Sequence, residues 1–371
     1  MTPRRLGLVI NPIAGMGGRV GLHGTDGEAL TAARVRGAAP VTCLRAARAM
    51  TKLRSLVAAA DVTILTAGGA MGATVLDGLG MPHEVVHRPT MPSTTASDTR
   101  AAVAELADRS VDLLMVVGGD GTLRDAAATL GAREVATLGV PSGVKMHSSA
   151  FAVSPEAAAD VAARYLTDPD RVGLRIAEIV DHTERGPELF ATLRVPAIAG
   201  SVQAAKSVAP QRVDAIELAE LGRTLAREME PGRLYLLGPG TTAGHVCAAL
   251  GLPDSSLGVD AVVDGSLVGS DLGEAELLEL LSGHPRATLV LGVVGGQGFL
   301  LGRGNQQLSP AVLAAVGPDN VVVLAARSKI ATLQPPVLRV DVGDGVAEQP
   351  LRGYQRVRVA TGHSTVLRIV S

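Results

Sequence analysis

The strongest candidate for a catalytic segment is a glycine-rich turn around one aspartate, Val-Val-Gly-Gly-Asp-Gly-Thr-Leu-Arg-Asp at residues 116–125. Apolar residues before the turn are typical of a buried strand, and the residues after it are typical of a helix start. Glycine lets a backbone approach a phosphate closely, and the N–H groups of a helix start attract anions. A carboxylate beside phosphates makes chemical sense if Asp120 holds a metal ion or takes a proton from an attacking hydroxyl. The alternative is a structural turn, with Thr122 as the N-cap and Asp125 completing a capping box.

Two other turns in the first half of the chain carry glycines and polar groups. They are Asn-Pro-Ile-Ala-Gly at residues 11–15 and Gly-Val-Pro-Ser-Gly-Val-Lys-Met-His at residues 139–147, and each follows a short apolar run. Lys145 could neutralise charge that develops on a transferred phosphoryl group. The alternative is a solvated lysine followed by a histidine, His147, at a helix start.

Three more glycine-rich segments are candidates for ligand binding. Thr-Ala-Gly-Gly-Ala-Met-Gly at residues 66–72 lies at a predicted strand end, where open α/β sheets bind ligands. Gly-Pro-Gly-Thr-Thr-Ala-Gly-His at residues 238–245 again combines a strand, a glycine turn and a hydroxyl-rich helix start. Residues 295–305 contain five glycines, a cation and two amides, which suit an anionic or sugar ligand. For each of these segments, turn geometry alone is the alternative.

The charge balance of the chain excludes several classes of partner. Its 371 residues include 34 Lys plus Arg and 36 Asp plus Glu, a net charge of −2, which gives no general attraction to nucleic acids or anionic membranes. Lysine occurs at only four positions, and aromatic residues make up 2% of the chain. Phosphate binding would therefore depend mainly on backbone N–H groups, for which the chain has 44 glycines.

Other familiar site types are missing from the sequence. Cys43 and Cys247 suggest neither a disulfide framework nor a cysteine-rich metal site. We find no signal-peptide pattern and no apolar run long enough to span a membrane, so we expect a soluble, cytoplasmic protein. Residues 15–21 mimic a dinucleotide fingerprint, but Gly-Thr-Asp-Gly at 24–27 prevents the long helix that should follow, and Pro12 lies in the turn. A Rossmann dehydrogenase is therefore not favoured. The sequence has no metal-binding histidine spacing, nucleophile elbow or Walker-type motif.

The first 150 residues alternate apolar runs with helical patterns, which predicts a doubly wound α/β domain with a parallel sheet. Ser154 before Pro155 predicts an N-capped helix through residue 166. The other predicted helices are 44–58, 94–108 and 122–130, and the predicted strands are 6–10, 62–66, 84–87, 112–117 and 135–138.

Polar segments at 167–170 and 181–188 indicate a boundary, after which strand-like runs dominate. We therefore predict an α/β nucleotide-binding domain over 1–168 and a β-rich, acceptor-binding domain with helical insertions over 169–371. The last residues are candidates to return to the first domain. The predicted strands are 189–195, 234–237, 287–294, 321–326, 337–342, 357–359 and 366–370, with helices at 213–228 and 274–281.

The Gly-Gly-Asp-Gly-Thr segment resembles the signature of the superfamily that contains NAD kinases, diacylglycerol and sphingosine kinases, and phosphofructokinases. Residues 11–15 are similar to the Asn-Pro-x-(Ala/Ser)-Gly turn of lipid and NAD kinases. The Gly-Val-Lys-Met-His form of residues 143–147 is similar to the ATP-NAD kinase and acetoin-catabolism-protein-X group. The resemblance extends through residues 203–207 and 238–244.

This resemblance implies an ATP-dependent kinase that uses Mg²⁺ and transfers a phosphoryl group to the 2′-hydroxyl of NAD, giving NADP. Inorganic polyphosphate is the alternative donor, and a homodimer or homotetramer is implied. Asp120 would be the base that activates the hydroxyl, while the metal ligands stay unassigned. The implied nucleotide- and phosphate-binding residues are Asn11, Gly15, Gly68, Gly69, Gly118, Gly119, Gly121, Thr122, Lys145 and His147, and the implied acceptor-binding residues are Gly240, Thr241 and Thr242.

One departure from the family pattern keeps the acceptor open. NAD kinases carry an Asn-Glu or Asn-Asp pair near the start of the second domain, and here Gln203, Lys206 and Ser207 occupy that region. Arg124-Asp125 likewise differs from the Asn-Glu that follows the glycine motif of lipid kinases. The alternatives are a kinase for another nucleotide, a polyol or a lipid-like alcohol, and a regulatory protein that binds NAD or ATP without turnover. A sensor would have little use for the carboxylate of Asp120.

Overall fold

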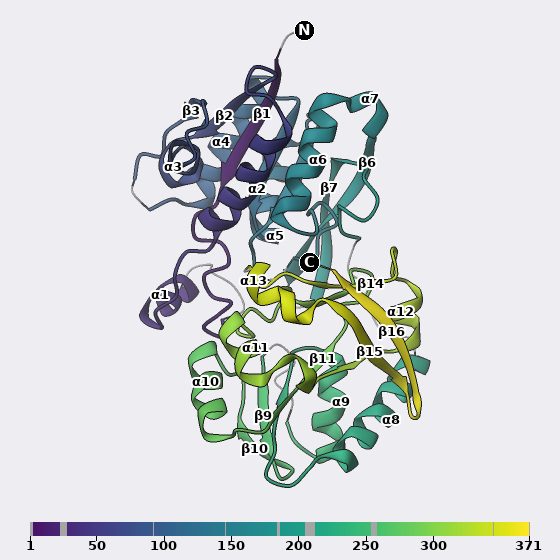
Figure 1. The fold of residues 1–371 in the computed structure, drawn as a ribbon. Coiled ribbons are helices and arrows are strands. Elements are labelled where there is room, and N and C mark those ends of the chain that lie inside the picture. Colours follow the sequence, from purple (N-terminus) through teal and green to yellow (C-terminus); the bar gives the residue numbers. More distant parts are fainter. Residues whose placement is uncertain are drawn as a thin grey trace. The chain divides into compact units, whose positions relative to one another are not determined.

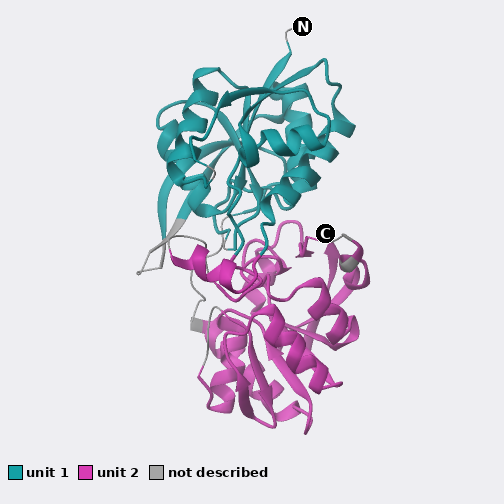
Figure 2. Ribbon diagram, turned by 90° about the vertical axis from the view of Figure 1, so that its left-hand side faces the viewer, with its two compact units in different colours: residues 1–16, 39–205 teal, residues 17–38, 206–371 magenta. Residues whose placement is uncertain are grey.

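The computed structural model describes residues 3–22, 28–91, 93–144, 146–183, 186–204, 212–253, 258–343 and 345–370. The chain forms two compact units, of which unit 1 comprises residues 1–16 and 39–205, and unit 2 comprises 17–38 and 206–371 (Figure 2). Lys145, Lys206 and Ser207 lie outside the described residues.

Unit 1 contains a five-stranded parallel sheet in the order β3-β2-β1-β4-β5 (Figure 1). The strand order reverses between β1 and β4, where the chain leaves the carboxyl ends of two neighbouring strands in different directions. Such a point is the usual ligand-binding position of an open α/β sheet. The strands are β1 (Arg4–Ile10), β2 (Val62–Ala67), β3 (Glu84–His87), β4 (Leu113–Gly118) and β5 (Ala136–Pro141).

Helices cover both faces of this sheet, as the sequence predicted. The side chains of β4 alternate: Leu113, Met115 and Val117 pack in one core, and Leu114 and Val116 pack in another. The first core contains residues of α2 (Thr42–Leu56) and α6 (Pro155–Thr167), and the second contains residues of α4 (Ala96–Asp108) and α5 (Asp120–Leu130). The short helices of unit 1 are η1 (Gly69–Met71), α3 (Ala73–Gly78) and α7 (Pro169–Val172).

The predicted cap of α6 is confirmed. Ser154 Oγ accepts a hydrogen bond from Ala157 N at 3.1 Å, and Pro155 occupies the first turn. This hydroxyl satisfies one of the N–H groups that have no partner inside the helix, so the helix begins where the sequence indicates.

A two-stranded antiparallel ribbon, β6 (Leu174–Thr183) with β7 (Gly186–Pro196), also belongs to unit 1. Its buried residues Ala177, Ile179, Leu193 and Val195 share a core with α4 and α5. The boundary that the sequence suggested between residues 168 and 169 therefore falls inside unit 1, because the apolar face of this ribbon packs on that unit. The described residues of the polar segment, 181–183 and 186–188, belong to the two paired strands instead of a linker.

Unit 2 contains a nine-stranded mixed sheet in the order β10-β9-β8-β11-β13-β15-β16-β14-β12. Strands β8, β11, β13 and β15 are parallel neighbours. The final strand β16 pairs within this sheet, so residues 363–370 stay in unit 2. The strands are β8 (Leu234–Leu237), β9 (Asp260–Val263), β10 (Ser266–Gly269), β11 (Ala287–Gly292), β12 (Phe299–Leu301), β13 (Val321–Leu324), β14 (Val337–Val340), β15 (Gly353–Ala360) and β16 (His363–Val370).

Helices pack on the sheet of unit 2 through alternating strand residues. Leu236 and Leu289 lie in a core with α10 and α11, whereas Leu237 and Val290 lie in a core with α8 and α9. This arrangement confirms a β-rich second part with helical insertions. The helices are α1 (Glu28–Val35), α8 (Arg212–Glu228), α9 (Thr241–Leu250), α10 (Glu274–Gly283), α11 (Pro310–Val316), η2 (Pro318–Asn320), α12 (Arg327–Ala331), α13 (Gly345–Glu348) and η3 (Gln349–Leu351).

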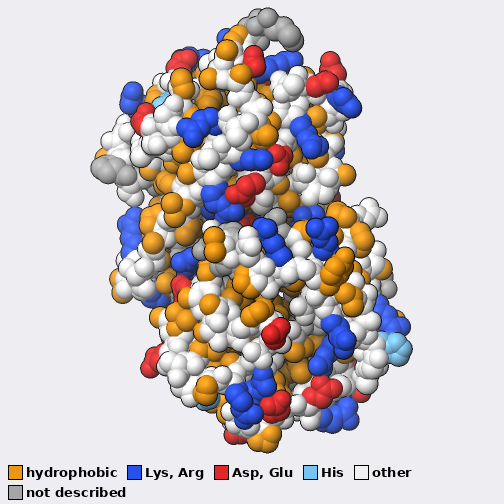
Figure 3. Space-filling model, viewed as in Figure 1, with side chains coloured by type: hydrophobic (Ala, Val, Ile, Leu, Met, Phe, Trp, Pro, Cys, Tyr) orange, Lys and Arg blue, Asp and Glu red, His pale blue; other side chains and the backbone are white. Residues whose placement is uncertain are grey.

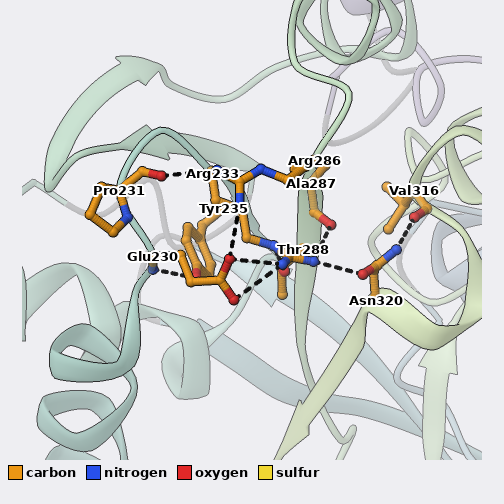
Figure 4. Close-up of polar contacts among 9 residues, drawn as sticks. All are labelled: Glu230, Pro231, Arg233, Tyr235, Arg286, Ala287, Thr288, Val316 and Asn320. Atoms are coloured by element: carbon orange, nitrogen blue, oxygen red, sulfur yellow. Dashed lines mark hydrogen bonds and ion pairs between the residues drawn. The ribbon is translucent and has the colours of Figure 1, made fainter.

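A polar network joins the amino ends of β8, β11 and β13 (Figure 4). Arg233 Nε donates to Thr288 Oγ1 at 2.8 Å, and its NH2 group donates to Asn320 Oδ1 at 2.7 Å. The same guanidinium forms an ion pair with Glu230 at 3.2 Å. One planar cation thus binds groups at three strand starts, so side chains hold this edge of the sheet together. The glycine turns of unit 2 lie at the opposite, carboxyl edge.

The surface is mixed in charge. Lys and Arg side chains are interspersed with Asp and Glu on the face drawn in Figure 3, consistent with the near-neutral composition. Across the parts of the chain that the structure describes, no helix is both long and apolar enough to cross a bilayer.

Candidate functional site

The turn between β4 and α5 contains three glycines, of which Gly118 has no room for a side chain. A Cβ atom on Gly118 would lie 2.4 Å from Thr122 Oγ1, so a larger residue there would displace the threonine. Gly119 is extended and occupies the N-cap position of α5. Gly121 differs, because a Cβ atom there would meet no other atom within 4 Å. Packing therefore requires glycine at position 118 but not at position 121.

Asp120 is the first residue of α5 and is only 9% exposed. Its Oδ2 accepts a hydrogen bond from His147 N at 2.7 Å, and its Oδ1 accepts one from Ser148 N at 3.0 Å. Both donors belong to the loop after β5. These contacts fix the orientation of the carboxylate, and its position at a helix start compensates its charge.

The loop after β1 meets the same turn. Asn11 Nδ2 donates to Thr122 Oγ1 at 3.0 Å, and Asn11 N donates to Val117 O at 2.9 Å. Thr122 is buried. The structure thus brings Asn11, Thr122 and Asp120 together at the point where the strand order of unit 1 reverses.

The structure contradicts the capping arrangement in the structural alternative for this turn. The N-cap of α5 is Gly119, and Thr122 lies inside the helix, where its hydroxyl bonds Asn11. The carboxylate of Asp125 forms an ion pair with Arg100 of α4 at 3.0 Å, away from the helix start. The capping box that was the structural alternative is therefore wrong, because both side chains have tertiary partners.

Gly15 connects the loops after β1 and β5. It has φ +75°, and a Cβ atom there would lie 2.1 Å from Ser142 O. Next to it, Ala14 O accepts from Thr42 Oγ1 at 2.7 Å, which in turn accepts from Ser142 Oγ at 3.0 Å. Only glycine fits this close approach of two loops.

Gly68 and Gly69 lie one strand further from Asp120, because β1 separates β2 from β4 in the sheet. Gly68 N donates to His87 O at 2.8 Å, so this turn is held to β3. Gly69 has φ +61° with no atom within 4 Å of its Cβ position. The turn lies at the predicted edge of the sheet, and its contacts have a structural explanation.

His147 reaches the site through its main chain. The resemblance implied that His147 binds nucleotide or phosphate, and in the structure its backbone N–H makes the contact with Asp120. Ser148, which contributes the second N–H, was not predicted, because a backbone donor leaves no signal in the residue type. Its buried hydroxyl accepts from Val180 N at 3.1 Å and so joins the loop to β6.

Two residues behind this loop were also not assigned from the sequence. Gln203 Nε2 donates to Ser148 O at 2.8 Å and to Met146 O at 3.2 Å. Arg175 of β6 donates to Ser149 O at 2.7 Å and to Gln203 O at 3.1 Å, and burial lowers the pKa of its guanidinium. The loop that holds Asp120 is thus itself held by an amide and a cation.

In unit 2, the predicted acceptor-binding residues lie between β8 and α9. Gly240 has φ +103° and is the N-cap of α9, followed by Thr241 and the buried Thr242. Thr242 Oγ1 accepts from Lys329 Nζ at 3.2 Å, and a Cβ atom on Gly292 would lie 2.9 Å from Thr242 Cβ. The carboxyl ends of β8 and β11 therefore meet here, beside a lysine from the segment after β13. The scarcity of lysine was the only sequence signal for Lys329.

The polar residues of segment 295–305 are used inside unit 2. The Arg303 and Asp341 side chains are each 3% exposed and form an ion pair at 3.0 Å. The Arg303 guanidinium also lies 3.9 Å from the Phe299 ring centroid, and Asn305 Nδ2 donates to Leu300 O at 2.7 Å. These contacts favour the structural interpretation of this segment over a ligand site.

Comparison with known families gives the class of this protein and then its family. Residues 6–170 match the model of the ATP-NAD kinase N-terminal domain, and residues 232–369 match that of the ATP-NAD kinase C-terminal domain. These matches indicate a phosphotransferase that acts on a hydroxyl group. The chain belongs to the ATP-NAD kinase family. No curated protein matches the chain significantly.

Proposed function

We propose that this protein transfers the terminal phosphoryl group of ATP to the 2′-hydroxyl of NAD, giving NADP. The observation that carries the proposal is the buried Asp120 carboxylate, which is fixed by His147 N and Ser148 N at the strand-order reversal of unit 1. Phosphoryl transfer needs little covalent chemistry from the protein, so positioning and charge stabilisation dominate. Asp120 would orient the acceptor hydroxyl and take its proton.

The glycine turns supply the donor side of this proposal. Gly118, Gly119 and the start of α5 offer backbone N–H groups to the phosphates, and Asn11 fixes Thr122 beside them. Lys145 is proposed to neutralise charge on the transferred group. On the acceptor side, Gly240, Thr241 and Thr242 of unit 2 are proposed to bind the dinucleotide.

The residues present fit a Mg²⁺ ion that is bound mainly by nucleotide phosphates. Among the described residues, no group of three or more His, Cys, Asp and Glu side chains could hold a metal ion. Kinase sites commonly hold Mg²⁺ through one or two carboxylates together with substrate phosphates, and Asp120 is a suitable carboxylate. When bound, the ion would neutralise charge on the phosphates.

The test is turnover by the purified full chain with ATP and Mg²⁺. NADP formation is followed with an NADP-specific dehydrogenase, and NADH, other nucleotides, polyols and polyphosphate are compared as substrates. Asp120→Asn keeps the shape of the side chain and is expected to lower kcat by about 10²–10⁴-fold. Asp125→Asn, on the same helix but paired with Arg100, is the matched control and should leave kcat almost unchanged.

Two outcomes would overturn the proposal. Undiminished transfer to NAD by Asp120→Asn would exclude the proposed role of the carboxylate. Binding of ATP and NAD without transfer to any acceptor would favour the regulatory alternative.

A further inference from the structure

Gln203 is a polar side chain in the interior of unit 1 and is only 2% exposed. Its Nε2 donates to Met146 O at 3.2 Å and to Ser148 O at 2.8 Å, and its backbone N donates to Phe151 O at 2.9 Å. Among the side-chain atoms that the structure describes, Gln203 Oε1 is buried without a hydrogen-bond partner. The amide therefore contributes to the loop through its donor group.

The carbonyl that Gln203 binds belongs to the same peptide group that donates to Asp120. The Met146 C=O and the His147 N–H form one planar trans peptide, whose C=O and N–H point in opposite directions. Gln203 Nε2 lies on the carbonyl side, and Asp120 Oδ2 lies on the N–H side. The Gln203 amide thus fixes which way this N–H points.

The second contact acts one residue further along. Ser148 N donates to Asp120 Oδ1, while Ser148 O accepts from the same Gln203 Nε2. The segment that contributes both N–H donors to Asp120 is therefore bound by a single side-chain amide, that of Gln203. Arg175 holds Gln203 in turn, because its guanidinium donates to Gln203 O.

We propose that Gln203 is a positioning residue that keeps the His147 and Ser148 N–H groups directed at Asp120, and so sets the orientation of the carboxylate during phosphoryl transfer. This proposal rests on the proposed function. It assigns a role to the region where the acceptor-binding pair of NAD kinases is missing from this sequence. Gln203 acts through the loop and contacts neither substrate.

Two substitutions separate the donor of Gln203 from its volume. Gln203→Glu keeps the shape but can donate only when it is protonated, whereas Gln203→Met fills the space and cannot donate at any pH. Burial favours the neutral form of a carboxyl group. Lowering the pH should therefore restore the donor in Gln203→Glu and leave Gln203→Met unchanged.

The first measurement is kcat as a function of pH for the wild type and both variants. At about pH 8 each variant should lose about 10- to 100-fold in kcat, from the two hydrogen bonds involved, with KM for ATP nearly unchanged. The ratio of wild-type kcat to Gln203→Glu kcat should fall towards about pH 6, whereas the ratio for Gln203→Met should stay constant. Gln355→Glu in unit 2, whose Nε2 also donates to backbone carbonyls, is the matched control and should behave as wild type.

The second measurement needs no turnover. Hydrogen–deuterium exchange of the His147 and Ser148 amides should become faster in Gln203→Met, while the amides of β1 and β4 keep their protection. Unchanged exchange of the two amides, or kcat ratios that are equal for both variants at every pH, would overturn the proposal. If the wild type phosphorylates no acceptor, the proposed function fails, and the exchange result still decides whether Gln203 orients the loop.

Discussion

Gly15→Ala and Gly69→Ala form a matched pair that measures the close approach of two loops in unit 1. Both glycines have positive φ, at +75° and +61°, so alanine is strained at either position. They differ in their surroundings, because a Cβ atom on Gly15 would lie 2.1 Å from Ser142 O, and one on Gly69 would meet no other atom within 4 Å.

The expected costs follow from these differences. Gly69→Ala should lower the free energy of unfolding by about 1–2 kcal/mol, the cost of the left-handed backbone conformation. Gly15→Ala adds a clash that must separate the loops and weaken the hydrogen bonds Thr42–Ala14 and Ser142–Thr42, at about 0.5–1.5 kcal/mol each. The expected total for Gly15→Ala is about 2–5 kcal/mol, or roughly 2–4 °C in Tm per kcal/mol for a unit of this size.

Urea denaturation followed by circular dichroism measures both variants, and thermal scans provide a second estimate. The KM for ATP is measured on the same samples under conditions in which the proteins are folded. Equal destabilisation of the two variants, within about 0.5 kcal/mol, would refute the packing explanation for Gly15. A large rise in KM without loss of stability would instead indicate that Gly15 is a phosphate contact.

Two further predictions concern unit 2. Arg303→Met should lower the free energy of unfolding by about 3–5 kcal/mol, because it leaves the buried Asp341 carboxylate without its cation. The double variant Arg303→Met with Asp341→Asn should lose at least about 2 kcal/mol less than the sum of the two single losses. Urea denaturation measures all three free energies. Additive losses would contradict this reasoning. In steady-state assays, Lys329→Met should raise the KM for NAD about 10-fold and change the KM for ATP little. The control Lys52→Met should change neither KM. An equal effect of Lys329→Met on both KM values would argue against a role of Lys329 in acceptor binding.

Much of the α/β part could be predicted because its signals are local. The run into Gly118 is buried on both faces of the sheet, and Ser154 before Pro155 caps α6, so short stretches of sequence suffice to place these elements. The motif around Asp120 was equally visible, since a carboxylate is a poor choice for a glycine turn that only binds anions.

The remaining features depend on contacts between distant residues. Residues 189–195 have the pattern of a strand, but their pairing with β6 and their packing on unit 1 follow from partners elsewhere in the chain. Backbone donors such as His147 N leave no mark on the residue type. Arg303 would be expected at the surface from its charge, and only the structure shows Asp341 and Phe299 around it.

The division of the chain also affects the order of events during synthesis. Residues 17–38 belong to unit 2, but the rest of that unit is formed by residues 206–371. On a ribosome that adds about 5–20 residues per second, this segment waits roughly 10–30 s before its partners are made. Strand β1, by contrast, is translated first and becomes the central strand of its sheet, with two later strands on each side. Unit 1 can thus assemble while the nascent chain still carries an early piece of unit 2. A cut between residues 205 and 206 would yield one fragment that contains all of unit 1 together with residues 17–38, and a second fragment that lacks this part of unit 2.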